Sequence, residues 1–403
     1  MQMPGKLAAF AAVVGLAACG GGGGDGGGGD TDWLYPLWVE TDVALADVDA
    51  DGRADVVTLA QYATSASQRE GRLIVHRQTA PGVFAPGDTY VVGTYPWRFE
   101  AADIDGDGRV DFVVTDADDA GVYLLQQNPA NPGSLLAPRR IASIEYPYDL
   151  AVADLDGDAL PDIAVACALK DSSRVVLLYQ DPARRGSFRP AVNFAVPGTA
   201  SSGVAAGDLN GDGRTDLLMA IAQAHTGYTP QLSLGVSLQQ PDGSLGAATL
   251  LAPQTGLNVQ TLAVADYDGD GRKDLLAYFT PFSTDFRAKL TVVLSGTEAG
   301  TFRSPVDTAL GDLKGLDDAV FADLDADGRP DAAVAGFFPV GSPSTVYSRL
   351  NLFTQAGNGA FALTSSRDLS VTASRLAAGD IDQDRRNELV ALGSKDKFLV
   401  IEP

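Results

Sequence analysis

An acidic nonapeptide of the pattern DxDxDGxxD recurs seven times along this chain of 403 residues. Successive copies begin 51 to 58 residues apart. A period this regular indicates one supersecondary unit that is repeated along the chain. The copies begin at Asp47, Asp103, Asp154, Asp208, Asp266, Asp323 and Asp380.

The acidic residues of each copy have the type and spacing of calcium ligands. Calcium takes six to eight oxygen ligands at about 2.3–2.6 Å, so alternating carboxylates on a tight turn can converge on one ion. Glycine at position six permits the turn, and the backbone carbonyl of position seven is expected to be a further ligand. The predicted ligands are, copy by copy, Asp47, Asp49, Asp51, Arg53 and Asp55; Asp103, Asp105, Asp107, Arg109 and Asp111; Asp154, Asp156, Asp158, Leu160 and Asp162; Asp208, Asn210, Asp212, Arg214 and Asp216; Asp266, Asp268, Asp270, Arg272 and Asp274; Asp323, Asp325, Asp327, Arg329 and Asp331; and Asp380, Asp382, Asp384, Arg386 and Glu388.

Two copies depart from the pattern at position six, where Ala159 and Arg385 replace glycine. A positive φ costs a residue with a Cβ conformational energy. We therefore predict up to seven bound calcium ions, with the third and seventh sites the weakest.

Two other interpretations of the acidic loops are weighed against this one. An EF-hand also begins DxDxDG, but it ends with glutamate at position twelve and lies between two helices. No copy here has that glutamate, and each loop is followed by a short apolar run typical of a strand. The remaining alternative is that the copies are solvated acidic turns without a metal.

Each repeat is predicted to contain four strands. The run before the loop is short and rich in small apolar residues, which suits the crowded innermost strand around a central axis. A second apolar run follows the loop at residues 56–60, 112–114, 163–166, 217–220, 275–278, 332–335 and 389–392. After a third β-rich run comes a turn with glycine followed two residues later by Phe or Leu, as in Gly82 and Phe84. Six copies of this turn exist, so we expect residues 33–38 to supply the missing strand of the seventh unit and to cover its edge.

These motifs resemble the FG-GAP or VCBS repeats that also build the β-propeller of integrin α-subunits. The resemblance covers residues 32–403. It implies an all-β, seven-bladed β-propeller with a calcium loop between the first two strands of each blade. Because a widespread fold does not determine function, the resemblance indicates the architecture and the metal but not the biological role.

The N-terminal segment has the features of an export signal and a tether. Lys6 precedes an apolar stretch of twelve residues, which is too short to span a bilayer of about 30 Å. Residues 16–19 resemble the lipobox of bacterial lipoproteins, so residues 1–18 are interpreted as a signal peptide and Cys19 as the lipidated residue. An ordinary secretory signal cut near Ala18 is the alternative. Residues 19–31 are glycine-rich and form a flexible tether. We expect a cell-envelope protein that is lipid-anchored outside the cytoplasm, at the outer membrane.

Charge and cysteine content agree with an extracytoplasmic metal-stabilised domain. The formal net charge is −23, which argues against nucleic acid as a partner. Besides Cys19 only Cys167 is present, so an intramolecular disulfide within the mature domain is excluded. Cys167 is interpreted as a small core residue. We expect a monomer whose only membrane contact is the lipid anchor.

The sequence offers little material for catalysis, and we expect a protein that is not an enzyme. It has two histidines, His76 and His225, which give no obvious catalytic triad. A carbohydrate-active enzyme, either a polysaccharide lyase or a hydrolase, is an alternative that would need a carboxylate pair. The loose candidates for such a pair are Asp116, Asp118, Asp119, Glu145 and Asp149.

Aromatic residues precede the first strand of three consecutive repeats and give the best functional lead. Exposed aromatic rings beside prolines suit stacking on sugars or gripping an extended peptide. We therefore predict a binding module for a glycan or protein partner, on the face opposite the calcium loops. Packing between blades is the alternative role of these rings, and a structural or assembly element is the alternative function. The predicted ligand-binding residues are Tyr35, Trp38, Tyr95, Trp97, Tyr146, Tyr148 and Tyr228.

Overall fold

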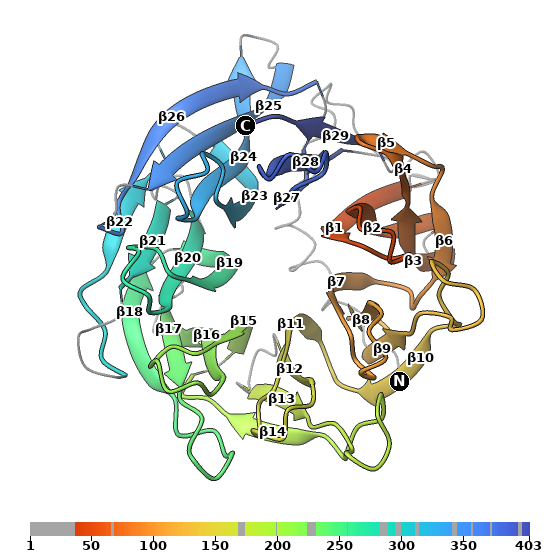
Figure 1. Ribbon diagram of the computed structural model, residues 1–403. Helices are drawn as coiled ribbons and strands as arrows, with labels where there is room; N and C mark the ends of the chain where they lie inside the picture. The colour runs from red at the N-terminus through yellow and green to blue at the C-terminus, as the bar shows by residue number, and fades with distance from the viewer. Residues whose placement is uncertain are drawn as a thin grey trace, which may run out of the picture. The chain divides into compact units, whose positions relative to one another are not determined.

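The computed structural model describes residues 37–65, 68–167, 174–198, 200–223, 231–255, 257–281, 289–294, 300–310, 314–340, 345–355, 358–370, 373–393 and 397–403. These residues form seven β-sheets arranged as blades around a central axis (Figure 1). The predicted all-β, seven-bladed propeller is confirmed. Within the described part of the chain, no helix is long and apolar enough to cross a membrane.

The first three blades contain fourteen strands, because a small hairpin is added to the first. Blade 1 comprises β1 (Leu37–Ala46), β2 (Asp55–Ser65), β3 (Gln68–His76) and β6 (Asp88–Val91), with the hairpin β4 (Gln78–Ala80) and β5 (Val83–Phe84) beside it. Blade 2 comprises β7 (Pro96–Ala102), β8 (Asp111–Asp116), β9 (Gly121–Leu125) and β10 (Arg139–Ser143). Blade 3 comprises β11 (Pro147–Ala153), β12 (Asp162–Cys167), β13 (Arg174–Leu178) and β14 (Val192–Ala195).

The other four blades contain fifteen strands in the described residues. Blade 4 comprises β15 (Ala200–Gly207), β16 (Asp216–Gln223), β17 (Gln231–Ser237) and β18 (Thr249–Thr255). Blade 5 comprises β19 (Leu257–Ala265), β20 (Asp274–Pro281), β21 (Lys289–Val293) and β22 (Val306–Ala309). Blade 6 comprises β23 (Lys314–Ala322), β24 (Asp331–Val340), β25 (Thr345–Gln355) and β26 (Phe361–Asp368), and blade 7 comprises β27 (Arg375–Gly379), β28 (Glu388–Leu392) and β29 (Phe398–Ile401).

Each blade is an antiparallel meander whose first strand is nearest the axis. The innermost strands β1, β7, β11, β15, β19, β23 and β27 surround the centre of the ring (Figure 1). They include the predicted runs of small apolar residues, but β1, β19 and β23 are nine or ten residues long, so the expectation that this strand is short was wrong for these three blades. Each predicted calcium loop connects an innermost strand to the second strand of the same blade.

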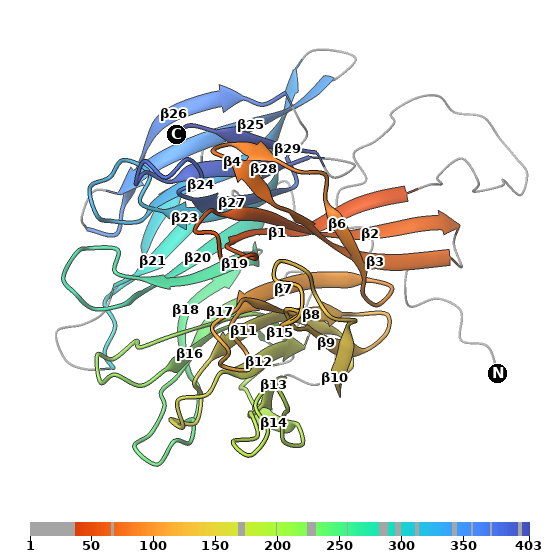
Figure 2. The same cartoon turned by 45° about the vertical axis from the view of Figure 1, so that its right-hand side comes forward.

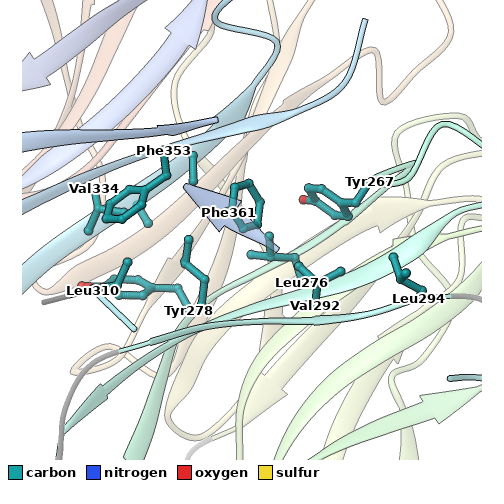
Figure 3. Packing of buried hydrophobic residues seen from close by; sticks show 12 residues of the cluster. Tyr267, Leu276, Tyr278, Val292, Leu294, Leu310, Val334, Phe353 and Phe361 are labelled. Atoms are coloured by element: carbon teal, nitrogen blue, oxygen red, sulfur yellow. The ribbon is translucent and has the colours of Figure 1, made fainter. Parts of the chain in front are cut away.

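The hydrophobic core is divided among the interfaces between neighbouring blades. Each of seven clusters of buried residues draws its members from two adjacent blades. Figure 3 shows the cluster between blades 5 and 6, where Tyr278 of β20 and Phe353 of β25 belong to one packed group. Side chains buried between blades hold the ring together through the hydrophobic effect.

The second residue of every acidic loop belongs to one of these interface clusters. It is apolar or aromatic in all seven copies, and in six of them it is at most 2% exposed. The residues are Val48, Ile104, Leu155, Leu209, Tyr267, Leu324 and Ile381. The geometry of each loop is thereby coupled to the packing of its blade against the next.

The ring closes between blade 7 and blade 1 by packing and by hydrogen bonds. One cluster joins Val43 and Val56 of blade 1 to Val390 of blade 7. Phe84 and Phe398 make an edge-to-face contact with ring centroids 5.2 Å apart. Blade 7 has three described strands, and residues 33–36, which we expect to supply its fourth, lie outside the described residues. Residues 37 and 38 of that expected segment belong instead to β1.

Candidate metal centres and aromatic surface

The acidic loops all lie at the same end of their blades. In blade 1, Ala46 and Asp55 pair directly beside the loop, whereas Leu37 and Ala63 pair at the opposite end of β1 and β2. The carboxylate at position one organises the turn. Asp47 accepts hydrogen bonds from the amides of Asp51 (3.0 Å) and Gly52 (2.9 Å), and the other loops repeat most of this pattern.

Carboxylates at positions one, three and nine converge in at least five loops. In the first, second, third, fifth and sixth loops, one oxygen from each of these positions lies within 4.8 Å of the others. Oxygens that share a calcium ion at about 2.3–2.6 Å can be at most about 5 Å apart, so these groups have the dimensions of a calcium site. They are Asp47, Asp49 and Asp55; Asp103, Asp105 and Asp111; Asp154, Asp156 and Asp162; Asp266, Asp268 and Asp274; and Asp323, Asp325 and Asp331.

Some loop oxygens are buried without a hydrogen-bond donor, which supports a cation as their partner. These atoms are Asp49 Oδ1 in the first loop, and Asp380 Oδ1 and Glu388 Oε1 in the seventh. A buried acceptor without a partner costs about 1–3 kcal/mol, and a coordinated metal removes that cost. The donor set is entirely oxygen, as calcium prefers over softer transition metals.

The aspartate at position nine is buried and joins three segments of its blade. Asp55 Oδ2 accepts the amide of Val48 at 2.9 Å, and its Oδ1 accepts the amide of Gln78, after the third strand, at 2.7 Å. Burial raises the pKa of Asp55, Asp111 and Asp216 to about 6 and that of Asp162 to about 7. A carboxylate in this environment favours a proton or a cation as its partner.

The position-five carboxylate belongs to none of these five close groups, and in six loops a guanidinium pairs with it. In five loops it pairs with the guanidinium of the arginine at position seven, as Asp51 does with Arg53. The third loop has Leu160 at position seven, and there Arg189 contacts Asp156 (3.3 Å) and Asp158 (3.6 Å) instead. The predicted roles of the position-five carboxylate and the position-seven carbonyl as ligands stay predictions.

A glutamine after the third strand links blades 2, 3 and 4 to the loop of the preceding blade. Gln180 of blade 3 is fully buried, and its side-chain amide donates to the carbonyl of Ile104 in the second loop at 3.0 Å. Gln127 and Gln239 reach the first and third loops in the same way. Sequence reasoning missed these residues, although glutamine recurs at this place in five repeats, at Gln78, Gln127, Gln180, Gln239 and Gln355.

The glycine of the Gly-x-Phe/Leu turn covers the loop of the preceding blade at three interfaces. A Cβ added to Gly133, Gly186 or Gly243 would meet the third residue of the preceding loop at 2.8, 3.3 and 2.1 Å, respectively. For Gly243 the atom met is the backbone carbonyl oxygen of Asp156. At these positions glycine is required by close approach as well as by a positive φ.

The two irregular loops adopt the same left-handed backbone as the regular ones. Ala159 has φ 66° and Arg385 has φ 74°, as the position-six turn requires. Position four is left-handed as well, and Ala50, Ala326 and Gln383 hold that conformation without being glycine. The seventh loop therefore bears the strain twice. The weaker affinity that we predict for the third and seventh sites stays a prediction.

The opposite end of the blades bears aromatic side chains, which form two separate groups in the described residues. The Tyr95 and Trp97 rings lie 5.4 Å apart, and Trp97 and Tyr148 lie 5.3 Å apart across the interface between blades 2 and 3. Trp38 pairs instead with Tyr62 of β2, at 5.5 Å. Tyr146 is 58% exposed. Tyr35 and Tyr228 lie outside the described residues, as do Cys19 and His225.

Two of the carboxylates considered for catalysis, Asp116 and Asp119, have structural hydrogen bonds. Asp116 is buried and accepts the amides of Thr94 (2.7 Å), Tyr95 (2.6 Å) and Asp119 (2.8 Å). It thereby fixes the segment that presents Tyr95. Asp119 pairs with Arg140 and Tyr123.

Polar side chains of the innermost strands connect neighbouring blades near the axis through hydrogen bonds. They stand five residues before six of the seven loops, directly after a β-bulge in most blades, and Gly203 takes this position in blade 4. Asp42, Asp149 and Asp318 each accept the backbone amide of the next innermost strand at 2.9–3.0 Å. Arg98 pairs with Asp42 and also donates across the ring to the carbonyl of Gln260. Asp149, which was considered for catalysis, therefore forms a hydrogen bond between blades 3 and 4.

Comparison with known proteins identifies the repeat. The model of the FG-GAP-like repeat matches residues 47–114, 103–165 and 160–219. Each match extends from one acidic loop to the second strand of the following repeat. The search of curated proteins found no match. The chain thus contains FG-GAP-like repeats, and its repeats are arranged as a seven-bladed β-propeller.

Proposed function

We propose that this propeller is a calcium-stabilised binding module that engages a glycan or protein partner outside the cytoplasm. The observation that carries the proposal is the row formed by Tyr95, Trp97 and Tyr148 at the end opposite the acidic loops. All three rings are partly exposed, and such rings combine a large apolar surface with a polar group at the edge. The propeller fold itself serves as a general interaction module.

Calcium has a structural role in this proposal. The loops lie at the far end of the blades from the aromatic row, and their second residues are buried between blades. A site with a dissociation constant on the order of 10⁻⁴ M in about 10⁻³ M calcium would gain roughly 1.4 kcal/mol of folding stability. Several such loops together would contribute a substantial part of the usual 5–15 kcal/mol of domain stability.

Membrane anchoring belongs to the same proposal. Cys19 would carry the lipid, and the glycine-rich residues 20–31 would hold the propeller away from the bilayer. Metabolic labelling with a fatty-acid analogue tests this directly. A Cys19→Ser variant that labels as strongly as the wild type would contradict the anchor.

A structural or assembly function is the second candidate, and one contact favours it. Trp97 and Tyr148 touch across the interface of blades 2 and 3, so the row also packs two blades together. A Trp97→Ala variant separates the two functions. Under the binding proposal, partner capture by the calcium-loaded protein falls at least tenfold while the melting temperature changes little. A large fall in melting temperature with retained capture would favour the structural function.

A further inference from the structure

The extended hairpin of blade 1 carries polar and aromatic side chains beside the aromatic row, and its Arg69 guanidinium lies 6.0 Å from the centre of the Tyr95 ring. Strands β2 and β3 have eleven and nine residues, whereas their counterparts in blade 2, β8 and β9, have six and five. The far ends of β2 and β3 project beyond the neighbouring blades (Figure 2). Tyr62 of β2 and its partner Trp38 of β1 belong to none of the interface clusters, so packing of the core does not require them.

A hollow of about 430 Å³ lies on the hairpin extension, within the size range of small-ligand sites. Its lining consists of Tyr62, Thr64, Gln68, Arg69 and Glu70. These residues supply one aromatic ring together with a hydroxyl, an amide, a guanidinium and a carboxylate, which can donate and accept hydrogen bonds in planar pairs. Such a set matches a ligand with both C–H faces and many hydroxyl groups.

Contacts among the side chains hold this lining in place. The Arg72 guanidinium lies 4.1 Å from the centre of the Tyr62 ring and 5.3 Å from that of Trp38. Arg72 Nε also donates to Glu70 Oε1 at 2.7 Å. Thr64 Oγ1 donates to Gln68 Oε1 at 2.9 Å. A side chain already held in one rotamer loses less entropy when a ligand binds.

The charges at the hollow balance one another. Arg72 pairs with Glu70, and Arg69 pairs with Asp118 at 3.6 Å. The site therefore offers no excess cation to an acidic polymer, and the net charge of −23 repels one. A bound peptide strand would need the part of β3 before Arg72, which extends beyond the pairing with β6, but charged residues such as Arg69 and Glu70 on an edge disfavour strand addition.

From these observations we infer that the β2–β3 hairpin binds uncharged pyranose units of a neutral polysaccharide. The inference rests on the proposed binding function and specifies its ligand class. An apolar sugar face would lie against the Tyr62 ring in the hollow, while Gln68 and Glu70 would bond to neighbouring hydroxyls.

The test is titration calorimetry of the calcium-loaded full chain with neutral and acidic polysaccharides. The probes are a β-glucan, a mannan and a xylan, with polygalacturonate as the acidic comparison. Saturable binding of a neutral probe is expected, and Tyr62→Ala and Gln68→Ala should each weaken it at least tenfold. The control Leu363→Ala, at a 56% exposed position on β26, should leave it unchanged. Melting curves of all variants check that the propeller stays folded, since none of these residues lies in a core cluster.

Three results would overturn the inference, and they differ in what they leave of the proposed function. If no neutral probe binds, but a protein or polygalacturonate is captured in a Trp97-dependent manner, the ligand class is wrong and the binding function stands. If the full chain captures no partner of any class, both fail. Neutral-glycan binding that survives both hairpin substitutions would also overturn the inference, because it would place the site elsewhere.

Discussion

Replacing Gly243 with alanine tests whether the turn of one blade seals the metal loop of the preceding blade. Gly243 has φ 84°, and an added Cβ would lie 2.1 Å from the carbonyl oxygen of Asp156 in the third loop. Either blade 4 must move away from this loop, or the loop must deform. Asp156 is a predicted calcium ligand, so calcium affinity should fall together with stability.

The matched control is Gly82→Ala, at the same position of the turn in blade 1. Gly82 has φ 69°, and a Cβ there would meet no atom within 4 Å. A left-handed backbone costs an alanine about 1–2 kcal/mol, which both variants should show. Forcing packed backbone apart adds typically 1–3 kcal/mol, so Gly243→Ala should lose about 2–5 kcal/mol in total.

The assay is urea unfolding at saturating calcium, followed by calcium titration of the folded variants. Gly243→Ala should unfold at clearly lower urea concentration than Gly82→Ala, and one calcium site should weaken in Gly243→Ala alone. Equal losses of stability in the two variants, with unchanged calcium binding in both, would refute the sealing of the third loop by blade 4.

Three further predictions concern the acidic loops. Because burial raises the pKa of Asp55, Asp111, Asp162 and Asp216 above the usual value of about 3.9, the folded metal-free protein binds more protons than the unfolded chain. Its melting temperature should therefore fall as the pH rises from about 4 to about 7, and calcium should abolish the fall; a rise over this range in EDTA would contradict the burial argument. Ala159→Gly and Arg385→Gly should each raise stability by about 1 kcal/mol in calcium, since glycine adopts the left-handed backbone without strain; unchanged or lower urea midpoints would exclude strain at position six. Gln180→Ala should cost about 1–3 kcal/mol of stability, because it leaves the Ile104 carbonyl without its donor. The control Gln240→Ala removes the side chain of an exposed glutamine and should cost little. Equal urea midpoints of the two variants would show that the hydrogen bond between blades 2 and 3 is dispensable.

The architecture could be predicted from the sequence because the acidic nonapeptide carries both a local and a global signal. Its carboxylates and its glycine fix a turn, as the bonds from Gly52 and Asp51 to Asp47 illustrate. The number of its copies gives the number of blades. The apolar runs after each loop then had to be the second strands, and β2, β8 and the five equivalent strands include them.

Contacts between blades could not be predicted in the same way, because they join residues far apart in the sequence, 76 positions for Gln180 and Ile104. Gln180 reaches the second loop and Gly243 the third, and neither pairing follows from the chemistry of a single repeat. Comparing the repeats with one another would have revealed the glutamine and the apolar residue at position two. Trp38 pairs with Tyr62 of the long β2–β3 hairpin, whereas Trp97 pairs with Tyr95. The length of this hairpin is particular to blade 1 and does not follow from the repeated motif.

Calcium can influence ligand binding only indirectly, because the metal loops and the aromatic row lie at opposite ends of the blades. Trp97 precedes Asp103 by six residues along β7, which at about 3.3 Å per residue places them about 20 Å apart. An ion in the second loop cannot touch a ligand that lies on Trp97. The same loop, however, places Ile104 in the cluster that also holds Leu150 of β11, the strand that carries Tyr148. Loss of the ion would loosen the interface across which Trp97 and Tyr148 meet, so binding that disappears in EDTA would show coupling through blade packing and not coordination of the ligand.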